Sequence, residues 1–274
     1  MAASDVLAAL RAENARLVAL LEAHGIAWRL PSESLPSVSE QDLSRLAPHE
    51  KIALFRRLFR GRADVYPVRW ESRTSGKSGY TPACANEWRT DVCDKRRIKC
   101  ADCRHRELIP LTDEVIYDHL TGQHTLGVYP LLEDDTCHFL AGDFDVAEWR
   151  ADALAFAQSC DELGVPVALE ISRSGQGAHA WIFFTDPVPA RDARRLGTAI
   201  ISHTCARTRQ LTRTSYDRLC PNQDKLPKGG FGNLIALPLQ KHPREQGRSL
   251  FVDRDWRPFP DQWTFLASIS LMPP

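Results

Sequence analysis

The sequence lacks the features that would place it in a membrane or on a secretory route. None of its 274 residues belongs to an apolar run of about 18, the length that spans a bilayer. Residues 1–17 carry charges throughout and contain no apolar stretch typical of a signal peptide. We therefore expect a cytoplasmic protein with no membrane partner.

The chain also lacks an excess of charge of either sign. Its 35 Lys and Arg balance its 35 Asp and Glu, so the whole molecule is no polycation. A content of 43% hydrophobic and 26% charged residues is ordinary for a folded globular protein. The length suffices for one large domain or two small ones, each with a sizeable core. The eight cysteines, without a secretion signal, argue against a disulfide framework.

Four of the cysteines lie close together in a polar stretch. Cys84, Cys93, Cys100 and Cys103 have the spacing C-x8-C-x6-C-x2-C, and four thiolates can close a tetrahedral zinc site. His105 is a possible substitute ligand, and four unrelated core thiols are the alternative interpretation. Seven Lys and Arg between residues 84 and 106 would suit nucleic-acid phosphates, or simply form a solvated basic face.

The N-terminal part of the chain predicts a helix followed by a linker. Residues 4–24 carry a heptad seam, and 30–47 form a linker that is rich in Pro and Ser in its first part. The helix either packs on its own domain or makes a dimer, so the protein is a monomer or a dimer through this segment. The seam consists of Leu7, Leu10, Asn14, Leu17 and Leu21.

The pattern beyond residue 48 is a mixture of helices and strands. Apolar periodicity predicts helices at 48–60, 113–121, 148–163 and 190–210. It predicts strands at 65–70, 126–132, 137–145, 165–172, 178–184, 233–239 and 249–253.

Two aspartates end the strand expected at 137–145. Asp143 and Asp145 flank Phe144, so their carboxylates point to the same face of an extended strand and repel each other. Such a pair at the end of a buried strand is costly unless a cation lies between the two groups. Mg²⁺ or Mn²⁺, which prefer oxygen ligands, are the natural cations.

A glycine-rich turn and a histidine follow in the next pair of strands. In "EISRSGQGAHAW", glycines allow close approach to a ligand, and Ser174 and His179 can donate to a phosphate oxygen. Further on, Asp217 and Asp224 are candidates for a third carboxylate of a two-metal site. Residues 205–249 hold nine Lys and Arg against three Asp and Glu, which suits a polyanionic substrate; a solvated loop whose aspartates cap turns is the alternative.

These motifs, in this order, resemble the archaeo-eukaryotic primase superfamily. The stretches "YPLLEDDTCHFLAGDFD", "SRSGQGAHAWIFF", "PNQDKLPKGGFGNLIALPLQ" and "DQWTFL" look like the primase domain of TOTE conflict systems, over roughly residues 50–266. The resemblance implies an α+β fold in which an RRM-like antiparallel sheet lies beside a second α/β unit, with the site between them. It implies a catalytic domain at 48–274 with an inserted zinc knuckle at 81–106.

The resemblance also implies roles for individual residues. Asp143 and Asp145 would hold the two catalytic Mg²⁺ or Mn²⁺ ions, either Asp217 or Asp224 would be the third carboxylate, and His179 would contact the nucleotide phosphates. The remaining candidates for nucleotide or template contacts are Ser172, Ser174, Gly175, Gly177, Lys225, Lys228 and Arg248.

The implied reaction is nucleotidyl transfer by two-metal catalysis, as a DNA primase or polymerase. Its substrates would be nucleoside triphosphates and a single-stranded DNA template, with helicase or nuclease parts as possible partners in a conflict system. Two other interpretations use the same residues. A metal-dependent nuclease or phosphoesterase would cleave a bound strand with water, and a non-catalytic zinc-knuckle module would only bind nucleic acid.

Overall fold

The computed structural model describes residues 13, 16–17, 20, 23–24, 46–72, 74–145, 147–208 and 219–274. The chain forms two compact units, residues 1–39 and 40–274. In the first unit, five of the six described residues are helical, and Arg16 pairs with Glu13 at 2.8 Å. The rest of the predicted helix and most of the predicted linker lie outside the described residues.

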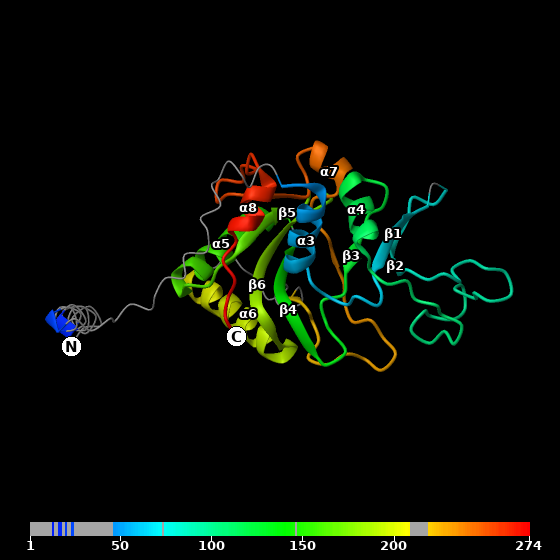
Figure 1. Cartoon of the computed structure of the whole chain (residues 1–274), viewed down its shortest axis with the longest axis horizontal. Helices are drawn as coiled ribbons and strands as arrows, with labels where there is room; N and C mark the ends of the chain where they lie inside the picture. The colour runs from blue at the N-terminus through cyan, green and yellow to red at the C-terminus, as the bar shows by residue number, and fades with distance from the viewer. Residues whose placement is uncertain are drawn as a thin grey trace. The chain divides into compact units, whose positions relative to one another are not determined.

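The second unit is built on a five-stranded antiparallel sheet with the order β7-β4-β6-β5-β9 (Figure 1). Its strands are β4 (Thr136–Phe144), β5 (Ala168–Ile171), β6 (Ala178–Pro189), β7 (Leu219–Cys220) and β9 (Leu250–Val252). The two long strands, β4 and β6, lie side by side in the middle. Because both faces of the sheet are covered, the centres of both strands, residues 139–142 and 180–184, are apolar without polar alternation.

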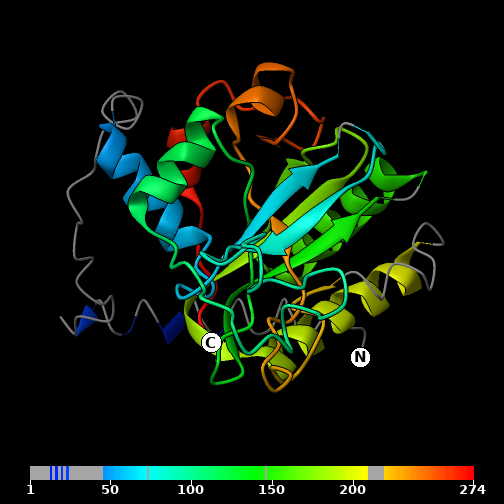
Figure 2. The same ribbon diagram turned by 90° about the vertical axis from the view of Figure 1, so that its right-hand side faces the viewer.

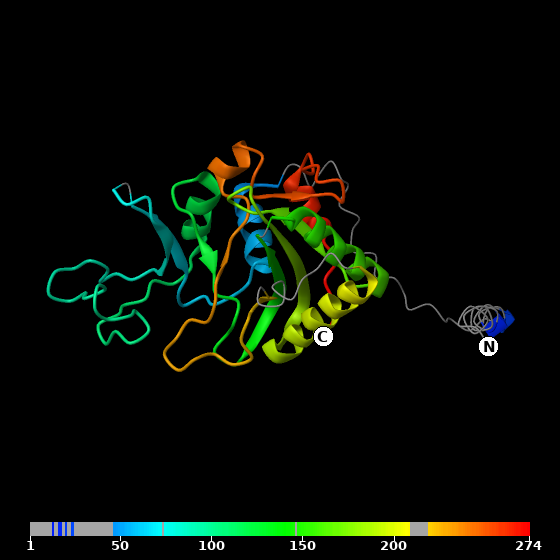
Figure 3. The same ribbon diagram turned by 180° about the vertical axis from the view of Figure 1, so that it is seen from behind.

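Two helices cover one face of this sheet (Figure 3). They are α5 (Trp149–Leu163) and α6 (Ala190–Arg207), and each buries residues spaced three or four apart. Gly197 allows α6 to lie close to the sheet, since a Cβ there would stand 2.8 Å from a methyl of Leu219 and 2.9 Å from one of Leu140. The α5 helix ends at Gly164, whose left-handed backbone closes the last turn.

The other face packs against a second group of elements. Phe59 of this group meets Trp181 of β6 edge-on, with 5.0 Å between ring centroids. The group comprises α3 (Pro48–Leu58), α4 (Asp113–Thr121), α7 (Lys241–Glu245), α8 (Gln262–Ser268) and the strand pairs β1 (Pro67–Glu71) with β2 (Ser78–Pro82) and β3 (Gly127–Val128) with β8 (Ile235–Ala236). In Figure 2 the β1–β2 hairpin crosses in front of the sheet.

The cysteine-containing segment joins β2 to α4. It consists of turns, and the bridge between Cys84 and Leu108 closes it on itself just beyond β2. We call residues 84–106 the knuckle. The knuckle extends beyond the β1–β2 hairpin in both Figure 1 and Figure 3.

The mixed α+β fold with antiparallel sheets confirms the predicted fold class in its coarse form. Helix α4 has the predicted bounds, whereas the strands predicted at 126–132 and 233–239 shrink to two residues each. Strand β2, strand β7 and helices α7 and α8 were not predicted. The described part of the chain contains no helix that is long and apolar enough to cross a membrane.

Candidate active site

The central feature of the site is a row of three polar side chains across adjacent strands. In the sheet register, Asp143 of β4 is opposite His179 of β6, and His179 is opposite Glu170 of β5. Directly opposed residues place their side chains on the same face, 4.5–5.5 Å apart at Cβ. The row therefore projects from the face that also carries Trp181, toward the second group of elements.

His179 is held between two carboxylates. Its Nδ1 lies 2.8 Å from Glu170 Oε2, and its Nε2 lies 3.7 Å from Asp143 Oδ1. The indole Nε1–H of Trp181 donates to the same Glu170 oxygen at 3.0 Å, so this fully buried carboxylate has two donors. Because Nδ1 faces an acceptor, it carries the proton, and Nε2 is directed toward Asp143.

The charge state of His179 follows from the same contacts. Burial lowers the pKa of the imidazole, but the negative charges of Glu170, Asp143 and Asp145 together outweigh that effect and raise it. The protonated ring can donate from Nε2 to an anionic oxygen. Asp143 keeps 40% of its side-chain surface exposed, so a ligand can reach its carboxylate, whereas the His179 side chain keeps only 7%.

Asp145 stands just beyond the end of β4 and is exposed. Its backbone is packed against Gly177, where an added Cβ would lie 2.7 Å from the carbonyl oxygen of Phe144 and 3.4 Å from Asp145 Cα. Only glycine fits this approach without displacing the backbone. Gly177 thus fixes the loop that carries Asp145 against the glycine-rich turn.

The turn between β5 and β6 is closed by its own hydroxyls and amides. Ser172 and Ser174 share a hydrogen bond of 3.0 Å between their Oγ atoms, and the Gln176 N–H donates to Ser174 Oγ at 3.1 Å. Gly175 has φ +75°, and Arg248 lies directly over it, with its Nη1 donating to the Ser174 carbonyl at 3.2 Å. The turn and Arg248 form one surface.

A cationic cavity of about 390 Å³ adjoins this surface. Arg248, Arg173 and Arg69 line it, and the first two belong to the turn region just described. Burial raises the pKa of the Tyr80 phenol, and the positive charges of Arg173 and Arg69 partly offset this rise. Both guanidinium groups therefore lie close to that ring. The other charged or titratable lining residues are His124, His242 and Glu71, and Glu71 is paired with Arg69 at 2.9 Å. The cavity is suited to an anion with several oxygens.

The two candidates for a third carboxylate have different outcomes. Asp224 pairs with Arg194 of α6, and the nearby Leu226 N–H donates to Asp135, next to the start of β4. The length of β4 from there to Asp143 is roughly 23 Å, so the structure does not bring Asp224 to the row. Asp217 lies outside the described residues, two positions before Leu219, which pairs with Gly142 beside Asp143.

Lys225 and Lys228 are also not brought to the row. Both are exposed in the loop that follows Asp224, at the far end of β4. The physical reason is that this loop is bound to the knuckle: Arg106 Nη1 donates to the carbonyl of Gly229 at 2.6 Å.

Comparison with known proteins decides the family. Residues 50–274 match the model of the archaeo-eukaryotic primase domain of TOTE conflict systems. The chain belongs to this primase family. That membership supports a nucleotidyltransferase type of activity. Among solved structures, one that resembles the chain is the polymerase domain of ligase D from Mycobacterium tuberculosis in complex with DNA, with 13% sequence identity, a TM-score of 0.39 and coverage of 86% of this chain and 85% of that one. No curated protein matches the chain.

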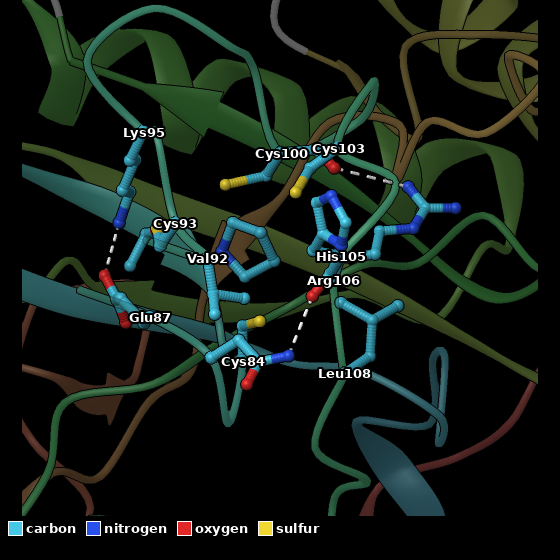
Figure 4. Close-up of a pocket in the computed structure, with 13 residues that line it drawn as sticks. Cys84, Glu87, Val92, Cys93, Lys95, Cys100, Cys103, His105, Arg106 and Leu108 are labelled. Carbon is cyan, nitrogen blue, oxygen red and sulfur yellow. Dashed lines mark hydrogen bonds and ion pairs between the residues drawn. The ribbon is translucent and has the colours of Figure 1, made fainter. Parts of the chain in front are cut away.

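The knuckle of this primase-family chain gathers the four predicted cysteines around one small cavity (Figure 4). Cys84, Cys93, Cys100 and Cys103 line a space of about 30 Å³ together with His105. Cys84 Sγ accepts from the Glu107 N–H at 3.3 Å, and burial, together with Cys93 and Cys84, helps to raise the pKa of Cys100. Within the described residues, however, no three His, Cys, Asp or Glu side chains stand close enough to hold a metal as they are.

Sequence reasoning missed Glu170, Arg69 and Arg173. Glu170 is the one charged residue within the apolar run "VPVALEI", and a carboxylate inside a buried strand requires a partner. That signal would have found it. Arg69 and Arg173 carry no such signal, because surface arginines are common and only the packing of the β1–β2 hairpin over the turn brings them together.

Proposed function

We propose that this chain is a primase-polymerase that joins nucleotides along a single-stranded DNA template. The observation that carries the proposal is the row Asp143–His179–Glu170, which places one aspartate of the DxD pair against the histidine of the glycine-rich motif. The adjoining cationic cavity supports a polyphosphate substrate. The family match over residues 50–274 agrees with both.

Asp143 and Asp145 are the proposed ligands of divalent metal, with Asp217 as the third carboxylate. The donor set fits Mg²⁺ or Mn²⁺, because it consists of accessible carboxylate oxygens, which these hard cations prefer. When bound, two such ions activate a 3′-hydroxyl and neutralise the leaving pyrophosphate. Asp224 is left to its ion pair with Arg194.

The protein's own groups would bind and orient the nucleotide. Ser172 and Ser174 share one hydrogen bond between their hydroxyls, so one O–H of the pair remains to donate to a phosphate oxygen. Arg248 would hold the phosphates from the cavity side, with Arg69 and Arg173 behind it. His179 would donate from Nε2 to an oxygen near Asp143, since Glu170 holds the opposite ring nitrogen.

We further propose that the knuckle binds one structural zinc ion through its four cysteines, with His105 as the possible substitute. The shared cavity and the N–H···S contact at Cys84 support this ligand set, as thiolates are the preferred ligands of structural zinc.

The wider setting is also a proposal. A family of TOTE conflict systems suggests helicase or nuclease parts as partners, in a cytoplasmic setting, and the N-terminal helix is a candidate for dimerisation. The five-stranded antiparallel sheet with two helices on one face supports the RRM-like description of the core, within a catalytic domain at 48–274.

The test is a gel assay with purified protein, labelled nucleotides, Mg²⁺ or Mn²⁺ and single-stranded template, with and without primer. The Asp143→Ala/Asp145→Ala variant is the negative control. Metal-dependent product that the variant fails to make supports the proposal, and product without a primer identifies a primase. Degradation of the template without incorporation would replace the proposal with the nuclease interpretation. Template binding without either reaction would leave the non-catalytic module.

A further inference from the structure

Trp88 is an exposed aromatic residue on the knuckle. It keeps 65% of its surface exposed, more than any other large hydrophobic residue in the described part of the chain. Its backbone has φ 60°, a left-handed conformation that bulky residues rarely adopt. The Arg89 N–H donates to the Asn86 carbonyl at 3.1 Å and closes the turn around it. The fold thus presents the indole to solvent at some conformational cost.

One cation fixes the position of this indole. Lys95 Nζ lies 5.1 Å from the centroid of the Trp88 ring, and Lys95 is itself ion-paired with the half-buried Glu87. A cation over an aromatic face is attracted to the ring electrons. The ring is therefore an oriented platform attached to the fold by the Glu87–Lys95 pair.

Exposed positive charge follows Lys95 directly. Arg96 and Arg97 are the next two residues, so their Cα atoms lie within about 8 Å of that of Lys95. They belong to the exposed cations of the knuckle, which are Arg89, Arg96, Arg97, Lys99 and Arg104. Three exposed acids, Asp91, Asp94 and Asp102, do not cancel them. An exposed aromatic face can stack on a nucleic-acid base, and the excess of cations beside it can pair with the neighbouring phosphates.

The knuckle is connected to the body of the domain through Arg106. Arg106 donates to the carbonyl of Ala101 in the knuckle and to that of Gly229 in the loop that follows Asp224. Its guanidinium lies 5.4 Å from the centroid of the Phe231 ring. Phe231 stacks in turn on Tyr129, next to β3. The knuckle is therefore held against the domain through Arg106.

We propose that the knuckle binds single-stranded nucleic acid, with one base stacked on Trp88 and the flanking phosphates on Arg96 and Arg97. A stacked base recognises no particular sequence, because every base has an aromatic face. This inference rests on the proposed function, since it assigns a second contact to the same template strand. It adds three contact residues, Trp88, Arg96 and Arg97, that lie outside the Asp143 row.

The test measures the affinity of the full chain for a fluorescent single-stranded oligonucleotide by anisotropy, at several salt concentrations. Trp88→Gly removes the ring while suiting the left-handed backbone, so it does not strain the turn. It is expected to weaken binding about tenfold, and Trp88→Phe is expected to keep most of the affinity. Tyr117→Ala removes another exposed aromatic residue, on α4, and is expected to bind as wild type.

The proposed phosphate contacts are tested with the double variant Arg96→Ala/Arg97→Ala. The control is Arg191→Ala/Arg195→Ala on α6. Loss of two phosphate contacts is expected to reduce the slope of log K against log salt by about 1.4, and the α6 pair is expected to leave it unchanged. Affinity of Trp88→Gly within twofold of wild type, with an unchanged salt slope in the knuckle pair, overturns the inference and points to an acidic protein partner for this patch.

Nucleotide incorporation in the same variants separates this inference from the proposed function. Incorporation by Trp88→Gly at saturating template is expected to keep its kcat with a raised KM for template. Suppose that wild type incorporates nucleotides and that Trp88→Gly keeps both the wild-type KM for template and the wild-type affinity for the oligonucleotide. In that case only the inference fails. If wild type incorporates nothing, the proposed function fails, and the anisotropy result alone decides whether the knuckle binds the strand.

Discussion

Asp143 and His179 are direct partners across β4 and β6, with 3.7 Å between Asp143 Oδ1 and His179 Nε2. The separation is too long for a hydrogen bond, so both atoms are directed at the same space without satisfying each other. Glu170 completes the arrangement from behind. The row brings a partly exposed carboxylate and a proton donor to one point on the sheet.

The first prediction concerns the carboxylates. Asp143→Asn, Asp145→Asn and Asp217→Asn are each expected to reduce nucleotide incorporation at least about a hundredfold, because each removes a charge from the proposed two-metal site. Single-turnover incorporation with Mg²⁺ and with Mn²⁺ measures the loss.

Asp224→Asn is the matched control. It removes a partner of Arg194 on α6, far from the row, and is expected to keep incorporation within about threefold of wild type. A loss comparable to that of Asp217→Asn would return Asp224 to the site.

The second prediction concerns Glu170. Glu170→Gln leaves the shape of the buried side chain but removes the charge that offsets the burial of His179. Incorporation is expected to fall by about 10- to 100-fold, as for other groups that orient a functional histidine. NMR titration of the metal-free variant is expected to show a lower pKa for the His179 ring; a normal ring pKa with full activity would contradict the role.

The third prediction concerns the cationic cavity. Arg248→Ala removes a guanidinium that bonds to the Ser174 carbonyl and lines the cavity. The KM for nucleoside triphosphate is expected to rise by about 10- to 100-fold, the equivalent of one charged hydrogen bond of about 1.5–3 kcal/mol. Steady-state kinetics measure it.

Affinity for single-stranded template provides the contrast for Arg248. It is expected to stay unchanged in Arg248→Ala, because the role proposed for this residue is to hold the nucleotide and not the strand. A variant that loses template affinity and keeps its nucleotide KM would assign Arg248 to the strand.

The fourth prediction concerns His119, a buried histidine of α4. Its Nδ1 accepts from the Leu126 N–H at 3.1 Å, so its Nε2–H donates to the Pro238 carbonyl at 2.9 Å. Burial lowers the pKa of this ring to about 4. The unfolded chain takes up the proton near pH 6.5, so the free energy of unfolding is expected to fall by about 3 kcal/mol as pH drops from 6.5 to 4.

Urea unfolding of wild type and His119→Gln at a series of pH values isolates this contribution. The variant is expected to be less stable at pH 7 and to lose less stability on acidification. Parallel pH dependences of the two proteins would exclude His119 as the cause.

The fifth prediction concerns the knuckle metal. Cys100→Ser/Cys103→Ser is expected to lose bound zinc and to lower the thermal midpoint, because a structural zinc site contributes directly to folding. Cys205→Ser, outside the knuckle, is expected to keep one zinc per chain. Metal content is measured by atomic emission on protein purified without added zinc, and equal content in both variants would contradict the four-cysteine site.

Much of the core could be predicted from the sequence because its periodicity is local. The α4 helix starts at Asp113 after a Thr112 cap and ends at Gly122, and each of these signals lies in the sequence itself. Strand β4 and the turn at Gly175 were likewise predictable from an apolar run and from glycines at fixed spacing.

The third carboxylate and the cavity could not be predicted in the same way. Asp224 has a sequence context as suitable as that of Asp217, and only the pairing of Leu219 with Gly142 separates the two along β4. The short strands β7 and β2 have little pattern of their own, since their neighbours in the sheet, and not their propensity, make them strands.

Both edge strands of the main sheet, β7 and β9, come from the part of the chain after residue 218, whereas the inner strands β4, β5 and β6 are complete by residue 189. During synthesis the inner strands therefore emerge with both flanks unpaired, and unpaired strand edges are templates for association between chains. A premature stop in this interval would leave a sheet that is open on both sides. The ribosome thus synthesises Asp143, Glu170 and His179 well before it synthesises β7 and β9, the strands that cover the two edges of the sheet.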